Sequence, residues 1–171
     1  MAASLKWRYR PPLFVRTNRQ SLRLLEGIPR GLGRNYADAQ RLGLIDSRIA
    51  ALVATMNVPD LMNTIACCEG HGGWGRLSSP YVAFVAPVEL AAILHECLQA
   101  DALESRPRLN FYWSVEGGFG SDRQIVFRLS IPDINRYRWV SRSRIDNDIS
   151  VVREMILGVI DQFTDAVQRA K

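Results

Sequence analysis

The stretch LNFYWSVEGGFGSDRQIVFRLSI, Leu109–Ile131, decides the fold. Phe111 and Trp113 fall on one face of an extended chain in its first half, and Phe127 and Leu129 do the same in its second half. Such alternation is typical of half-buried β-strands. It predicts two antiparallel strands and a loose hairpin loop, at Leu109–Glu116, Gln124–Ile131 and Gly117–Arg123 respectively.

Five further segments, each with an apolar pattern that ends at a helix- or strand-breaking residue, extend this pair on both sides. They predict a helix from Tyr36 to about Met56, strands at Asn63–Cys68 and Pro80–Ala86, a helix from Pro87 to Asp101, and a C-terminal helix capped by Asp146 or Asn147. The order after the first 34 residues is helix, strand, strand, helix, strand, strand, helix. We therefore expect an α+β fold of two layers, with a four-stranded, mainly antiparallel sheet covered by helices.

We expect two regions in the chain: a basic arm, residues 1–34, and a single α+β domain, residues 35–171. Residues 1–50 carry ten Lys or Arg against three Asp or Glu, although the net charge of the whole chain is only +5. No apolar run approaches the roughly 18 residues that a membrane span needs, and no apolar stretch follows the basic N-terminus as in a secretory signal. Three cysteines do not form a disulfide framework. These features predict a cytoplasmic protein, monomeric or homodimeric, with no membrane partner.

The glycine-rich stretch ACCEGHGGWG, Ala66–Gly75, contains the residue types of a small reactive site. Cys68, Glu69 and His71 are the candidates for a Cys/His-dependent or metal-assisted hydrolase. Neighbouring strand residues face opposite sides, so Cys67 and Cys68 cannot both bind one ion. The sequence therefore assigns no metal and no cofactor, and a merely structural connection rich in glycine stays open as an alternative.

Two segments interleave arginine with aromatic residues, a combination that suits stacking and contact with anionic groups. These candidate partner-binding residues are Trp7, Arg8, Tyr9, Arg10, Arg136, Arg138, Trp139 and Arg142. The same residue types are also enriched at protein interfaces. Nucleic-acid binding is thus one option, and binding of an acidic protein surface is another.

The segments NTIACCEGHGG, PYVAFVAP, LNFYWSVEG and FRLSIP resemble small bacterial proteins carried on plasmids, prophages and integrative elements. The resemblance covers roughly residues 60–135. Proteins of such elements include inhibitors of host defence, anti-CRISPR proteins among them, which act by binding a protein or nucleoprotein complex. The resemblance thus implies a non-enzymatic interaction protein with a host protein or nucleoprotein partner, and the hydrolase remains the alternative.

Overall fold

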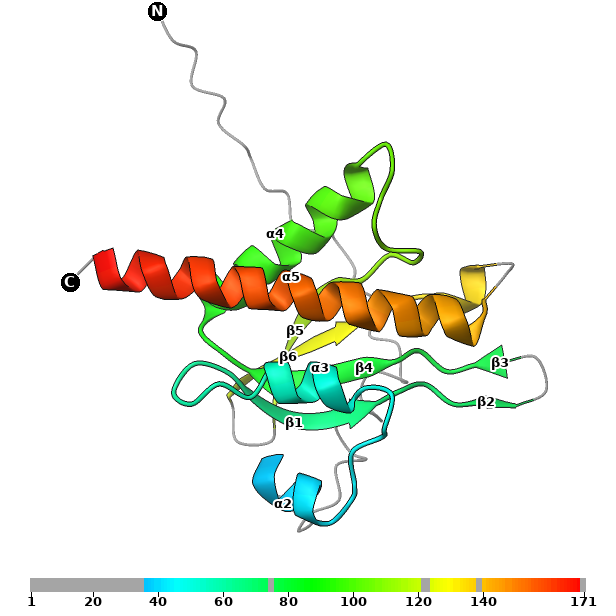
Figure 1. Cartoon of the computed structure of the whole chain (residues 1–171), viewed down its shortest axis with the longest axis horizontal. Helices are drawn as coiled ribbons and strands as arrows, with labels where there is room; N and C mark the ends of the chain where they lie inside the picture. The colour runs from blue at the N-terminus through cyan, green and yellow to red at the C-terminus, as the bar shows by residue number, and fades with distance from the viewer. Residues whose placement is uncertain (1–35, 74–75, 121–123, 138–139, 170–171) are drawn as a thin grey trace, which may run out of the picture.

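The computed structural model describes residues 36–73, 76–120, 124–137 and 140–169. Its centre is a four-stranded antiparallel sheet with the strand order β1-β4-β6-β5 (Figure 1). The strands are β1 Asn63–Cys68, β4 Tyr81–Val85, β5 Ser114–Phe119 and β6 Ile125–Ser130. The predicted α+β fold is confirmed, because both expected antiparallel pairs form and β4 joins β6 to make them one sheet.

The glycine-rich stretch connects the edge strand β1 to the inner strand β4. A short antiparallel pair, β2 Gly72–Gly73 with β3 Arg76–Leu77, lies inside this connection. Cys68 is the last residue of β1 and lies opposite Tyr81 in the β1–β4 pair. Cys68 therefore lies at a corner of the sheet, where the chain leaves the edge strand.

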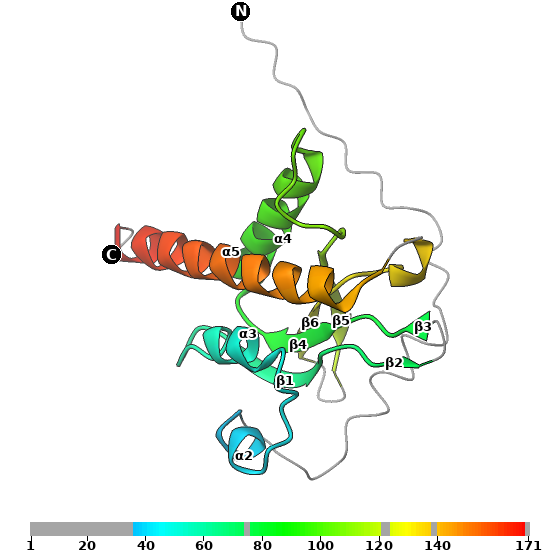
Figure 2. The same cartoon turned by 45° about the vertical axis from the view of Figure 1, so that its right-hand side comes forward.

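Helices cover one face of the sheet, as the sequence predicts. They are α3 Ala50–Thr55, α4 Val88–Leu103 and α5 Arg142–Arg169, and α5 contacts both α3 and α4. Figure 2 shows the remaining helix, α2 Tyr36–Arg41, on the far side of β1 from α5. A short 3-10 turn, η1 Ile134–Arg136, precedes α5.

The hydrophobic core lies between this helical layer and alternate residues of the inner strands. Val82 and Phe84 of β4, and Phe127 and Leu129 of β6, are all buried. From the helices, the buried residues of the same cluster include Leu52, Leu90, Leu94, Leu98, Val152 and Ile156. Burial of each large aliphatic side chain contributes roughly 1.5–3 kcal/mol, so the alternation predicted from sequence also identifies the face that stabilises the domain.

The single helix expected between residues 36 and 56 is instead two short helices. Gly43 follows α2 with φ +65°, a left-handed conformation that favours glycine and ends a right-handed helix. The expected apolar stripe is consequently divided: Leu52 and Met56 are buried, whereas Leu42 is 49% exposed. The loop between α2 and α3 brings Asp46 to the end of β1, as described below.

The strand expected from residue 109 begins only at Ser114. Asp148 of α5, which is fully buried, accepts hydrogen bonds from the backbone N–H groups of Asn110 (2.8 Å) and Phe111 (3.0 Å) and from the indole N–H of Trp113 (3.2 Å). These donors bond to a carboxylate rather than to a neighbouring strand. The segment therefore keeps its buried apolar residues without joining the sheet.

The C-terminal helix begins at Arg142, four residues before the expected cap Asp146. The basic arm at the other end of the chain, residues 1–34, lies outside the described residues. Within the part of the chain that the structure describes, no helix combines the length and the apolar character that crossing a bilayer requires.

Candidate metal centre

Three side chains with metal-ligating atoms converge at the corner of the sheet. One carboxylate oxygen of Asp46, the sulfur of Cys68 and one ring nitrogen of His71 all lie within 4.8 Å of one another. Nε2 of His71 is 3.6 Å from Oδ2 of Asp46. Asp46 and Cys68 are partly buried, whereas the His71 side chain is 69% exposed. The described residues contain no second group of this kind.

Backbone N–H groups of the loop hold two of the three ligand atoms. Glu69 N–H donates to Oδ2 of Asp46 at 3.0 Å, and Gly70 N–H donates to the sulfur of Cys68 at 3.4 Å. Donors of this kind orient a ligand atom. The loop that follows Cys68 thus fixes the positions of both the Asp46 carboxylate and the Cys68 sulfur.

Ser78 holds the backbone of His71 from both sides. The N–H of His71 donates to Oγ of Ser78 at 2.7 Å, while the carbonyl oxygen of His71 accepts from Ser78 Oγ (3.1 Å) and Ser78 N–H (2.8 Å). The imidazole is exposed, but its Cα position is restrained by these three bonds. The side chain can therefore adjust its ring while its attachment point stays in place.

Gly70 allows the loop to approach this same segment closely. Its φ is +80°, and a Cβ atom built on it would lie 2.5 Å from the carbonyl oxygen of Ser78. No real Cβ tolerates so short a contact with backbone. Glycine is therefore required at this position both by conformation and by space.

Arg142, at the start of α5, binds the loop from the helical side. Its Nη1 donates to the carbonyl oxygens of Glu69 (2.8 Å) and Gly70 (2.6 Å), and its Nε donates to Oδ1 of Asp146 at 3.2 Å. Arg48 pairs with the same Asp146 and donates its backbone N–H to Oε2 of Glu69 at 3.1 Å. Two arginines and two carboxylates thus connect the loop to α5 and to the turn before α3.

The structure separates the three residues that the sequence singled out for catalysis. Cys68 and His71 are brought together, whereas the carboxylate of Glu69 pairs with Arg48 and Arg142. Asp46 completes the cluster, and sequence reasoning missed it. It lies 22 positions before Cys68, on another element, so no short motif contains both.

Cys67, the neighbour of Cys68, packs against the hydrophobic core. Burial, followed by the nearby carboxylate of Asp46, raises the pKa of the Cys67 thiol from 9.0 to about 11. Cys67 therefore stays protonated at neutral pH and is a poor ligand, because metals bind the thiolate. As strand alternation predicts, the two adjacent cysteines face opposite sides of the sheet, so that Cys67 packs on the core and Cys68 belongs to the cluster.

His95 and Cys97 of α4 also carry atoms that can bind a metal, but neither belongs to the cluster. His95 and Cys97 lie on that helix, and Nε2 of His95 lies 3.2 Å from the side-chain nitrogen of Gln99, which itself bonds to Tyr112. Burial raises the pKa of the Cys97 thiol. A fourth protein ligand from α4 is thus not part of the arrangement.

The predicted partner-binding residues are mostly beyond what the structure describes. Trp7, Arg8, Tyr9, Arg10, Arg138 and Trp139 lie outside the described residues. Arg136 is 82% exposed at its side chain and pairs with Asp133 at 3.2 Å. Arg142 is engaged by the loop and Asp146, and its side chain is only 25% exposed. Of the two arginines that the structure describes, Arg136 is thus the one on the surface.

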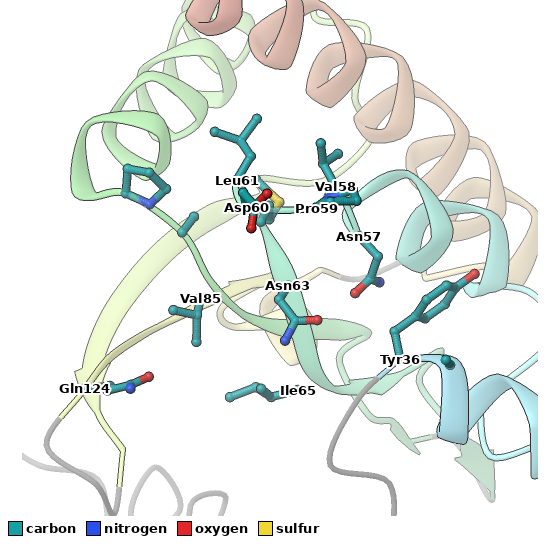
Figure 3. Close-up of a pocket in the computed structure, with 14 residues that line it drawn as sticks. Tyr36, Asn57, Val58, Pro59, Asp60, Leu61, Asn63, Ile65, Val85 and Gln124 are labelled. Atoms are coloured by element: carbon teal, nitrogen blue, oxygen red, sulfur yellow. The ribbon is translucent and has the colours of Figure 1, made fainter. Parts of the chain in front are cut away.

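An open cavity of about 730 Å³ lies at the opposite end of β1 (Figure 3). Tyr36, Leu61, Ile65 and Val85 are among its lining residues, and Asp60 is the acidic group among them. Cys68 and His71 are not in its wall. This cavity is therefore separate from the metal-ligand cluster.

Comparisons of the chain with protein-family models, with curated proteins and with solved structures found no match.

Proposed function

We propose that this chain is a metal-assisted hydrolase that binds a zinc-class divalent ion through Asp46, Cys68 and His71. The observation that carries the proposal is the convergence of a thiol sulfur, an imidazole nitrogen and a carboxylate oxygen within 4.8 Å. Sulfur and imidazole ligands are typical of zinc, and the addition of one carboxylate is compatible with it.

The spacing of the ligand atoms supports this set. In a tetrahedral site with zinc–nitrogen and zinc–oxygen bonds of about 2.0–2.2 Å, two such ligands are roughly 3.3–3.6 Å apart. The observed 3.6 Å between His71 Nε2 and Asp46 Oδ2 is close to that value. The other two separations, each at most 4.8 Å, would shorten on metal binding, and the exposed ring of His71 is able to move.

A thiol nucleophile activated by His71 would use the same residue types in a different geometry. In such a relay, one ring nitrogen serves the thiol and the opposite nitrogen bonds to the carboxylate. Here a single ring nitrogen lies near both the sulfur and the carboxylate oxygen. This convergence favours a shared cation over a proton relay.

Asp46, Cys68 and His71 would hold the ion through one atom each, and three protein ligands would leave room for water, as in catalytic zinc sites. The ion would supply a water of lowered pKa for attack on an ester. The exposed position of His71 keeps the site open to substrate.

Zinc titration of metal-free protein by calorimetry tests the proposal, with protein that carries no polyhistidine tag. We expect one zinc per chain, and at least about 100-fold weaker binding in Asp46→Asn, Cys68→Ala and His71→Ala. Cys97→Ala, which removes a thiol outside the cluster, is the matched control. Equal zinc binding by all four variants, or no stoichiometric zinc, would contradict the proposal. Zinc-dependent hydrolysis of 4-nitrophenyl acetate, lost on chelation, would then establish the reaction.

A second candidate function rests on the distribution of charge. Residues 1–34 contain eight Lys or Arg and one Glu, whereas residues 35–171 contain fourteen basic and sixteen acidic residues. The positive charge of the chain is thus concentrated in the arm. We propose as this second function that the arm and Arg136 engage an anionic partner, a host protein or nucleoprotein complex of the kind that the resemblance to mobile-element proteins implies.

A further inference from the structure

The face of the sheet opposite the helices carries a cation near the cluster. Cys68 lies opposite Tyr81 on β4, and Arg128 of β6 lies opposite Ala83, two residues further along β4. Strand alternation therefore places Cys68, Tyr81 and Arg128 on the same face. Neighbouring strands are about 4.8 Å apart, so Arg128 is on the order of 10 Å from Cys68, within the reach of one small substrate.

The guanidinium of Arg128 is oriented by the ring of Tyr81. Its Cζ atom lies 4.7 Å from the centre of that ring, a cation–π contact. A guanidinium held over a ring by this attraction keeps its N–H groups available as hydrogen-bond donors. Tyr81 thus prepares Arg128 for an additional hydrogen-bond acceptor.

Among the described residues, Arg128 lacks a carboxylate partner. Glu116 of β5 lies directly opposite it, but no ion pair joins the two. The Nε atom of Arg128 is shielded from solvent and has no hydrogen-bond partner in the described part of the chain. A shielded N–H without an acceptor is costly and calls for an explanation, and an acceptor supplied by a ligand provides one.

We propose that Arg128 binds an anionic group, a phosphate or carboxylate, of the substrate that is hydrolysed at the Asp46–Cys68–His71 centre. This inference rests on the proposed function for the reaction, but the anion position is built from other residues. Guanidinium groups bind both kinds of anion through paired N–H donors. The substrate class is therefore an ester whose scissile bond is separated by a short spacer from a phosphate or carboxylate group.

Inorganic phosphate is the first probe, titrated into metal-free wild-type protein and followed by calorimetry. We expect Arg128→Gln to weaken phosphate binding at least tenfold. Arg106→Gln is the matched control, since Arg106 is an exposed arginine before β5. Arg128→Lys should give an intermediate loss, because it keeps the charge without the planar donors. Unchanged phosphate binding by Arg128→Gln would overturn the inference.

The zinc-loaded enzyme provides the second measurement, with mono(4-nitrophenyl) succinate and 4-nitrophenyl acetate as the charged and neutral ester substrates. Arg128→Gln should lower kcat/KM for the succinate ester at least tenfold more than kcat/KM for the acetate, through a higher KM. An equal effect on both substrates would overturn the inference, because it would indicate general damage. Failure of zinc to bind would instead contradict the proposed function, while phosphate binding that depends on Arg128 would still support the anion position.

Discussion

Nη1 of Arg142 donates to the carbonyl oxygen of Gly70 at 2.6 Å, which ties the first residue of α5 to the loop that follows Cys68. The same Nη1 donates to the carbonyl oxygen of Glu69. The N–H groups of Glu69 and Gly70 are the ones that hold Asp46 and Cys68. Arg142 therefore holds the Glu69–Gly70 peptide group, whose N–H donates to the sulfur of Cys68, and it holds the residue whose own N–H donates to Asp46.

Arg142→Ala should weaken zinc binding without removing a ligand. Changes in residues that orient metal ligands typically lower metal affinity about 10–100-fold, and loss of the charged hydrogen bonds should lower the free energy of unfolding by about 2 kcal/mol. Calorimetric titration and urea unfolding measure the two effects. Arg153→Ala is the control, because Arg153 donates a single exposed bond to Thr55. Unchanged zinc affinity in Arg142→Ala would show that the loop is held by other contacts.

Asp148→Ala should be the most destabilising single carboxylate substitution in this part of the molecule. The carboxylate is fully buried and accepts from Asn110, Phe111 and Trp113. Its removal leaves buried donors unpaired, so we expect a loss of about 3–5 kcal/mol in the free energy of unfolding. Asp165→Ala on the exposed end of α5 should change it by less than about 0.5 kcal/mol. Urea denaturation compares the two.

The sheet is predictable from the sequence because buried residues such as Phe127 and Leu129 alternate with exposed ones, and this alternation can be read from neighbouring residues alone. The same alternation gives the wrong start for β5. Phe111 and Trp113 alternate just as well, yet hydrogen bonds from the Phe111 backbone and the Trp113 indole go to Asp148, which lies more than 30 positions away. Periodicity reports which side chains are buried, and it does not report the partners of the backbone.

In the candidate metal centre, too, only the residues that lie close together in the sequence are predictable. Cys68 and His71 are predictable because they lie in one short loop and their residue types bind metals. Asp46 could not be identified, because its approach to Cys68 depends on the break at Gly43 and on the path of the chain into α3. Glu69 was a natural candidate beside Cys68, but its pairing with Arg48 and Arg142 is a tertiary contact.

Cys67 should make stability depend on pH in the alkaline range. Its folded pKa is raised from 9.0 to about 11, mainly by burial and then by Asp46, so between these values the unfolded chain loses this proton before the folded chain does. Stability is therefore fully present below about pH 9 and falls as the pH rises toward 11. In Cys67→Ala this part of the decline should be absent, as measured by urea unfolding at intervals from pH 8 to 11. A decline of equal slope in both proteins would contradict the assignment.

Charge reversal in the basic clusters tests the second proposed function. Replacing Arg136 and Arg138 by Glu should abolish partner capture from a host lysate without lowering the thermal midpoint of unfolding. Arg153→Glu together with Arg169→Glu, on α5, is the control of equal charge change. Capture in the presence and absence of nuclease separates a nucleic-acid partner from a protein partner. Full capture by the Arg136→Glu, Arg138→Glu protein would exclude this cluster as the contact.

Gly70→Ala should damage both the fold and the metal centre. The methyl group would lie 2.5 Å from the carbonyl oxygen of Ser78, at a φ of +80° that alanine adopts only with strain. Since backbone must move to relieve the contact, we expect a loss of about 2–4 kcal/mol in the free energy of unfolding and weaker zinc binding, because Gly70 N–H would leave the sulfur of Cys68. Gly158→Ala is the opposite control: it lies within α5 with open space around its Cβ position and should stabilise the protein by about 0.5–1 kcal/mol. Equal stability of the two variants would mean that the backbone at Gly70 can move without cost. The loop would then not be rigid enough to position the ligands.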